Sequence, residues 1–192
     1  MFQSLLANLA RSLDGARIPY MVIGGQAVLV HGEPRLTRDI DVTLGVDSSA
    51  LGRILALGES IGLSPSVRDV KEFVHRTNVL PLSDKSSIRV DFIFSFTPYE
   101  EQAIGRAISI KVRDVSVRFA TAEDLIIHKL VAGRARDLED VRGILSRRKN
   151  IDAAYLERWL LTFREVLGRD LFREFESIRG SLPGPGDTHV VR

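Results

Sequence analysis

Two glycines stand between two stretches that both have the pattern of a β-strand, and this order restricts the folds open to the chain. Residues 18–23 form a short apolar run, which a Gly-Gly pair at 24–25 ends. Residues 39–44 read Asp-Ile-Asp-Val-Thr-Leu, so polar and apolar side chains alternate. The first pattern predicts a buried strand and the second a half-buried one. Because side chains alternate between the two faces of a strand, Asp39 and Asp41 are expected to point to the same side.

The rest of the chain predicts a sheet with helices, followed by a helical carboxy-terminal third. Leucines at the spacing of one helix face predict a first helix over 2–16, and a short helix is expected over 26–30. Further strands are expected at 72–80, 87–95, 108–113 and 115–119. Further helices are expected at 47–61, 121–132, 137–148, 152–166 and 169–179. The fold class is therefore α/β (α+β), with a mixed β-sheet flanked by helices.

A third aspartate, Asp91, lies within an apolar strand pattern, where a charged residue rarely lacks a partner. Carboxylates close together repel each other unless a cation compensates, and Mg²⁺ prefers hard oxygen ligands. Two such ions about 3.5–4 Å apart can hold the attacking and leaving oxygens of a phosphoryl transfer. Two simpler interpretations stay open: Asp39 and Asp41 line a solvated edge strand, and Asp91 forms a salt bridge with Arg89 or Arg118.

The Gly24-Gly25 pair, after a strand and before a helix, has the features of a phosphate-binding turn. Glycines allow close approach of a phosphate, and the start of a helix offers free N–H groups to an anion. The chain has neither a G-x-x-x-x-G-K-[ST] loop nor a G-x-G-x-x-G fingerprint. An ordinary strand-to-helix turn explains the two glycines equally well.

The whole order, a strand, Gly-Gly, thirteen residues, Asp-x-Asp and a later Asp, resembles the polymerase-beta-like nucleotidyltransferase superfamily. The segments GGQAVLVHGEPRLTRDIDV and TAEDLIIHKLVAGRARDLEDV are most similar to minimal nucleotidyltransferases and AbiEii-type toxins of toxin–antitoxin systems. The resemblance covers roughly residues 18–145. With the patterns along the chain, it leads us to expect a nucleotidyltransferase catalytic core over 1–120 and a helical portion packed on the core over 121–179. The glycine- and proline-rich composition of residues 180–192 predicts a flexible tail.

The resemblance also implies a role for each matching residue. Gly24 and Gly25 would contact a nucleoside triphosphate, and Lys129 would approach its phosphates. Two Mg²⁺ ions, with Mn²⁺ as an alternative, would be held by three catalytic residues, Asp39, Asp41 and Asp91. Asp91 would also help to activate the acceptor hydroxyl. Asp137 and Asp140 match an acidic pair of the family, to which no role is assigned, and Gln26 departs from the small or hydroxyl residue that many relatives have.

Two cations have competing interpretations. Arg38 directly precedes Asp39, where a cation would stabilise charge on the leaving pyrophosphate. The alternative is a surface arginine that balances Glu33 and the aspartates. Lys129 lies in an apolar helix pattern, so its ammonium group either serves the phosphates or reaches water past a buried stem. The neighbouring His128 is interpreted as a packed or surface histidine rather than a ligand.

Composition excludes several classes of protein. Without cysteine, the chain has no disulfide, no thiol catalysis and no zinc–cysteine site. No apolar stretch of 18 residues occurs and the amino terminus lacks a signal-peptide pattern, so a cytoplasmic protein without a membrane partner is expected. Residues 111–150 hold ten Lys/Arg against six Asp/Glu. This basic segment is either a site for phosphates or nucleic acid or a solvated helix surface.

These observations favour an enzyme that transfers NMP from a nucleoside triphosphate to a hydroxyl acceptor. The acceptor would be a tRNA, a protein or a small molecule, and the resemblance to toxins implies an antitoxin partner. The alternative is a catalytically inactive nucleotide- or RNA-binding module, or the partner-binding component of a toxin–antitoxin pair, since fold does not fix function.

Overall fold

The chain forms two compact units in the computed structural model, which describes residues 2–95 and 97–182. The first unit comprises the residues up to Val30 together with Pro34–Thr121. The second comprises His31–Glu33 and the residues from Ala122 onward. Of the tail predicted over 180–192, residues 183–192 lie outside the described part.

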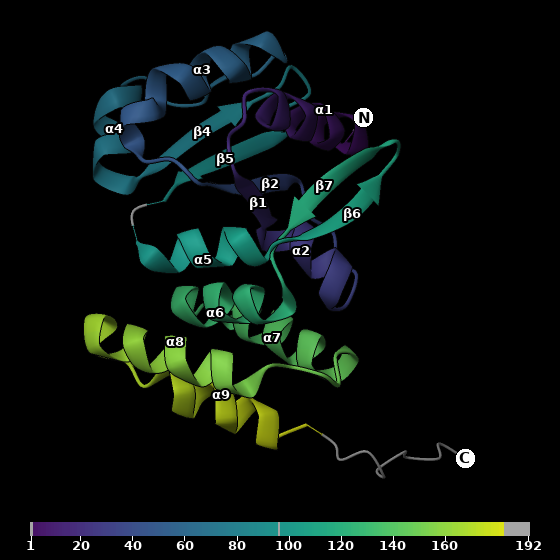
Figure 1. Ribbon diagram of the computed structural model, residues 1–192, viewed down its shortest axis with the longest axis vertical. Coiled ribbons are helices and arrows are strands. Elements are labelled where there is room, and N and C mark those ends of the chain that lie inside the picture. The colour runs from purple at the N-terminus through teal and green to yellow at the C-terminus, as the bar shows by residue number, and fades with distance from the viewer. Residues whose placement is uncertain (1, 96, 183–192) are drawn as a thin grey trace. The chain divides into compact units, whose positions relative to one another are not determined.

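A seven-stranded mixed sheet forms the centre of the first unit (Figure 1). Its strand order is β3-β4-β5-β2-β1-β7-β6. The pairs β2–β5 and β1–β7 are parallel and the remaining pairs are antiparallel. The strands are β1 (Tyr20–Ile23), β2 (Asp39–Leu44), β3 (Ser64–Pro65), β4 (Val79–Ser83), β5 (Arg89–Phe94), β6 (Ile108–Val112) and β7 (Val115–Phe119). The helices of this unit are α1 (Phe2–Gly15), α2 (Gly24–His31), α3 (Leu51–Ser60), α4 (Val70–Thr77) and α5 (Pro98–Arg106), with a 3₁₀ turn at Ser48–Ala50.

The two faces of this sheet differ in polarity at its centre. Val42 and Phe92 are paired across β2 and β5 and are fully buried on one face. Helix α3 packs on that face, where an added Cβ on Gly58 would lie 2.6 Å from Leu82 Cδ1. The opposite face carries the aspartates of β2 and β5, because side chains alternate along each strand.

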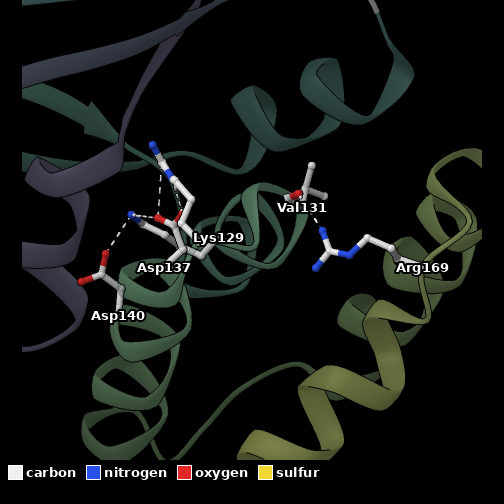
Figure 2. Close-up of polar contacts among 6 residues, drawn as sticks. Lys129, Val131, Asp137, Asp140 and Arg169 are labelled. Carbon is white, nitrogen blue, oxygen red and sulfur yellow. Dashed lines mark hydrogen bonds and ion pairs between the residues drawn. The ribbon is translucent and has the colours of Figure 1, made fainter.

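Four helices make up most of the second unit: α6 (Ala122–Ala132), α7 (Ala135–Arg147), α8 (Ala153–Leu167) and α9 (Leu171–Gly180). Helix α8 begins at Asp152, whose side chain accepts a hydrogen bond from the backbone N–H of Tyr155. The Tyr155 hydroxyl donates to the buried Asp124 at 2.6 Å and joins α8 to α6. The Arg169 Nη1 group donates to the backbone oxygen of Val131 at 3.3 Å (Figure 2), which joins the α8–α9 loop to α6.

The predicted fold class, a mixed sheet flanked by helices with a helical carboxy-terminal portion, is confirmed. The strands predicted around Gly24-Gly25 and around Asp91 are present as β1, β2 and β5. Across residues 2–95 and 97–182, every helix is too short or too polar to cross a membrane.

The strand predicted over 72–80 is wrong, because most of that stretch forms helix α4 and only its end enters β4. Asp69 caps the helix by accepting a hydrogen bond from the backbone N–H of Glu72. Asn78 ends it in the left-handed conformation, which asparagine tolerates better than most residues. Two local caps thus outweigh a short run of strand-forming side chains.

Helix α5 was not predicted, although its start carries a clear signal. Thr97 and Glu100 form a capping box, and Pro98 occupies the first turn, where proline costs little. The helix buries Tyr99 and Ile104. The Ile104 carbonyl accepts a hydrogen bond from Arg118 at 2.9 Å, so α5 lies on the sheet face to which Arg118 points, opposite the buried Val117.

Candidate active site

The turn between β1 and α2 is shaped by glycine and lies against the second aspartate. Gly24 has a φ of +61°, which a residue with a side chain rarely adopts. A Cβ added at Gly24 would overlap the carboxylate of Asp41, and one added at Gly25 would overlap the side chain of Thr37. Both positions therefore need glycine, and the Asp41 carboxylate lies directly beside the start of α2.

Asp41 and Asp91 occupy directly paired positions on the parallel strands β2 and β5. Asp39 is paired with Arg89 one step away along the same face. Asp39 is exposed, and Asp41 and Asp91 are partly exposed, whereas the intervening Ile40 and Val90 are buried. Neighbouring strands lie about 4.8 Å apart. This pairing therefore groups the three aspartates on one face of the sheet, as predicted.

Arg89 forms an ion pair with the third aspartate. Its Nε lies 2.9 Å from Asp91 Oδ1. The hydrogen bond to Asp91 raises the pKa of Arg89, and the charges of Asp91, Asp39 and Asp41 raise it further. Of the two salt bridges that the sequence left open for Asp91, the one with Arg89 is therefore formed. Sequence reasoning did not assign Arg89 to the site, because its position opposite Asp39 depends on the strand register.

The three aspartates suit a magnesium ion in the chemistry of their donor atoms, but their side chains do not converge on one point. Within the part of the chain that the structure describes, no three His, Asp or Glu side chains are close enough together to hold a metal ion. The carboxylate oxygens of Asp39, Asp41 and Asp91 are ligands that Mg²⁺ prefers. They lie on adjacent strands on one face, and Gly24 places no side chain of its own against Asp41. Arg89 engages Asp91 Oδ1, so a metal ion at that oxygen would compete with the guanidinium.

The loop that enters β2 carries the predicted nucleotide-binding cation. Arg38 is exposed and directly precedes Asp39, and Arg35 is partly exposed. Thr37, between them, contacts the Gly-Gly turn through the space that Gly25 leaves. The loop therefore reaches the turn of the candidate site as well as its first aspartate, and the sequence did not indicate that Thr37 lies beside this turn.

Lys129 lies within the second unit, between two buried carboxylates (Figure 2). Its Nζ is 2.8 Å from Asp137 Oδ1 and 2.8 Å from Asp140 Oδ2. Only 6% of Lys129 is exposed, so the interpretation that its ammonium reaches water is wrong. The acidic pair to which the sequence assigned no role thus holds this ammonium. The predicted contact of Lys129 with phosphates stays a prediction.

The Lys129 network also perturbs one of its acids. Burial by itself would raise the pKa of Asp137, but hydrogen bonds from Arg134 and Lys129 outweigh it, so the pKa is lowered. Arg134 contributes through its Nε, 2.6 Å from Asp137 Oδ2. Burial lowers the pKa of the adjacent His128 to about 4, so His128 is a packed neutral histidine, as one of the two sequence interpretations held.

The chain is similar to nucleotidyltransferases in sequence and in fold. Residues 4–183 match a family described as the nucleotidyl transferase AbiEii toxin of a type IV toxin–antitoxin system. No curated protein matches the chain.

Solved structures share the fold at low sequence identity. The antibiotic-resistance factor ANT(2'')-Ia in solution superposes with a TM-score of 0.59 and 16% identity, covering 91% of this chain and 97% of its own. Its crystal structure with adenylyl-2''-tobramycin gives a TM-score of 0.55 at 16% identity over the same shares, 91% and 97%. The lincosamide adenylyltransferase LnuA with lincomycin bound gives 0.50 at 15% identity, covering 71% of this chain and 91% of its own. At these identities the likeness establishes the fold and not the acceptor.

Proposed function

The chain belongs to the AbiEii nucleotidyltransferase toxin family, and on this basis we propose that it transfers NMP from a nucleoside triphosphate to a hydroxyl acceptor with the help of divalent metal ions. The proposed metal ligands are Asp39, Asp41 and Asp91, and the preferred ion is Mg²⁺ or Mn²⁺. The observation that carries the proposal is the direct pairing of Asp41 with Asp91 beside the Gly24 turn. An aspartate on an ordinary solvated strand would not need a glycine packed against its carboxylate.

The residues of the chain divide the proposed reaction between them. Gly24 and Gly25 hold the triphosphate by backbone N–H groups at the start of α2, where the helix dipole favours an anion. Asp91 receives the proton of the acceptor hydroxyl as its oxygen bonds to the α-phosphorus. The bond from the α-phosphorus to the bridging oxygen breaks, and pyrophosphate leaves. Arg38 balances the charge that develops on that leaving group.

Metal ions, when bound to the three aspartates, would supply charge neutralisation on the phosphates and orientation of the attacking and leaving oxygens. Without a cation, three carboxylates on one sheet face repel each other and an incoming triphosphate. Arg89 compensates only part of this charge, because one guanidinium faces three acids. The electrostatics of the face therefore support a divalent ion as the partner of the aspartates.

The acceptor is proposed as a tRNA, a protein hydroxyl or a small molecule, and the partner as an antitoxin. The description of the family as a toxin of a toxin–antitoxin system supports the antitoxin partner. The adenylylated tobramycin in the ANT(2'')-Ia structure supports the third acceptor. Incubation of the protein with α-³²P-labelled triphosphates and each acceptor class would show directly which one becomes labelled.

Calorimetric titration tests the proposed site before the acceptor is known. ATP, GTP, CTP and UTP are titrated with and without Mg²⁺ into wild type, Asp39→Asn/Asp41→Asn and Asp114→Asn. Asp114 is an exposed acid paired with Arg11 and serves as the matched control. We expect metal-dependent binding of at least one triphosphate that the double variant loses and the control keeps. Equal binding by wild type and the folded double variant would rule out the aspartates as the metal site.

A further inference from the structure

Arg89 occupies a position from which it faces all three candidate metal ligands. It begins β5 directly opposite Asp39, and its Nε is 2.9 Å from Asp91 Oδ1. The Arg89 side chain is 54% exposed, whereas that of Asp91 is only 15% exposed. The arginine is therefore free to leave toward solvent, while the aspartate it would leave stays on the sheet.

This ion pair differs from an ordinary surface pair in what surrounds it. Arg11 and Asp114, the comparison pair in the same unit, are 2.7 Å apart with both side chains at least half exposed. Such exposed pairs contribute little to stability. At Arg89 the guanidinium also lies in the field of Asp39 and Asp41, which otherwise repel Asp91. Its presence therefore relieves the same repulsion that a bound divalent ion would relieve.

We propose that Arg89 is a positioning residue that occupies Asp91 in the metal-free protein and is displaced when a divalent cation binds. This inference rests on the proposed function, since it takes Asp91 as a metal ligand. Arg89 Nε holds Asp91 Oδ1, so a cation that binds this oxygen competes with the guanidinium, and its positive charge repels the guanidinium in any case. Arg89 consequently weakens metal binding and partly neutralises the metal-free site. Removal of the arginine should make metal binding tighter even though it removes no ligand.

Metal binding without nucleotide provides the direct readout. The Kd of Mn²⁺ is measured by electron paramagnetic resonance for wild type and Arg89→Gln. We expect the Kd of Arg89→Gln to fall by about fivefold, the upper range for breaking a solvent-exposed ion pair. Arg11→Gln, which removes an arginine of similar exposure from the comparison pair, should leave the Kd unchanged.

A double-mutant cycle separates the specific pair from a general effect of charge. In an Asp91→Asn background, Arg89→Gln should no longer tighten Mn²⁺ binding, because the pair is already broken. Arg38→Gln removes another cation beside Asp39 but leaves the pair intact, so its effect should be smaller and should vanish at high salt. Arg89→Lys keeps the charge without the guanidinium, so its Kd for Mn²⁺ should lie between those of wild type and Arg89→Gln. This variant replaces Arg89→Gln if the latter folds poorly.

Three outcomes would overturn the inference, and one of them also concerns the proposed function. An unchanged or weaker Mn²⁺ affinity in Arg89→Gln would show that the arginine does not compete with the cation. An equal gain in the Asp91→Asn background would reduce the effect to net charge. Mn²⁺ binding that is insensitive to Asp39→Asn/Asp41→Asn, or that is absent from wild type, would overturn the proposed metal site together with the inference.

Discussion

Gly24 and Asp41 share a space that has no room for another methyl group: a Cβ on Gly24 would overlap the Asp41 carboxylate. Ile23, the last residue of β1, is paired with Asp41 across the antiparallel β1–β2 ladder. The chain turns sharply after this pair, because Gly24 adopts a φ of +61°. The lack of a side chain at Gly24 therefore allows the proposed phosphate-binding turn to lie directly against Asp41, the second proposed metal ligand.

Gly24→Ala should abolish metal-dependent binding of triphosphate and transfer activity. Alanine in the left-handed conformation costs roughly 1–2 kcal/mol, and the added methyl displaces the Asp41 carboxylate. Calorimetric titration with triphosphate and Mg²⁺ measures the loss, and urea denaturation measures the stability of the variant.

Gly62→Ala is the matched control for that substitution. Gly62 has a φ of +83°, but a Cβ there would meet no atom within 4 Å. It should lose a similar conformational free energy and keep triphosphate binding. If Gly62→Ala lost binding as fully as Gly24→Ala, backbone strain rather than the contact with Asp41 would explain the effect.

The chemistry of the first unit follows from local patterns in the sequence to a large extent. Alternation along residues 39–44 is sufficient to place Asp39 and Asp41 on one face, because the period of a strand is two. The isolated charge of Asp91 in an apolar strand marks the partner strand. The glycine pair marks the turn, since few other residues adopt its backbone conformation.

Contacts between residues that are distant in the sequence could not be predicted from these local patterns. The pairing of Asp39 with Arg89 depends on strand register, which is set by the packing of the whole sheet. The burial of Lys129 depends on Asp137 and Asp140 from the next helix. Helix α4 has β-branched and aromatic residues that favour a strand, and the caps at Asp69 and Asn78 decide for the helix.

Lys129→Met should destabilise the second unit strongly. The substitution leaves Asp137 and Asp140 buried without the ammonium that lies 2.8 Å from each. Removal of one partner from a buried ion pair costs about 3–5 kcal/mol, and here Arg134 still compensates part of the charge of Asp137, so the lower end of that range is expected. Urea denaturation monitored by circular dichroism measures the change in the free energy of unfolding.

A triple variant separates loss of charge balance from loss of packing. Lys129→Met/Asp137→Asn/Asp140→Asn removes both buried negative charges as well and should recover a large part of the stability. If Lys129→Met lowers the free energy of unfolding by less than about 1 kcal/mol, a structural role for Lys129 is contradicted. The predicted role of the wild-type ammonium group in binding phosphates would then gain weight.

Arg147 fixes the short segment that precedes the loop into β2. Its Nη1 donates to the backbone oxygen of Gly32 at 2.8 Å, and Gly143 of the same helix lies beside Glu33. Arg147→Ala should raise the rate of amide hydrogen exchange over residues 31–38 by roughly two- to tenfold, the effect of one lost hydrogen bond. The matched control is Arg136→Ala, an exposed arginine of α7, which should leave that rate unchanged. Equal exchange rates in both variants and wild type would show that the segment is held by other contacts.

His128 should make the protein less stable as the pH falls through the range of histidine titration. Its pKa is lowered from 6.5 to about 4, first by burial and then by the charge of Lys129, although Asp124 opposes the shift. His128 therefore becomes protonated below about pH 6.5 in the unfolded chain. In the folded chain it stays neutral until the pH falls to about 4. Stability is full above the unfolded pKa and is lost progressively below it, by about 3 kcal/mol once both states are protonated. Urea denaturation at pH 7.5, 6, 5 and 4 should show this slope in wild type and a smaller slope in His128→Leu. His75→Gln, a substitution at an exposed histidine, should keep the wild-type dependence of the free energy of unfolding on pH. If His128→Leu also kept this dependence, other groups would be the cause of the acid sensitivity.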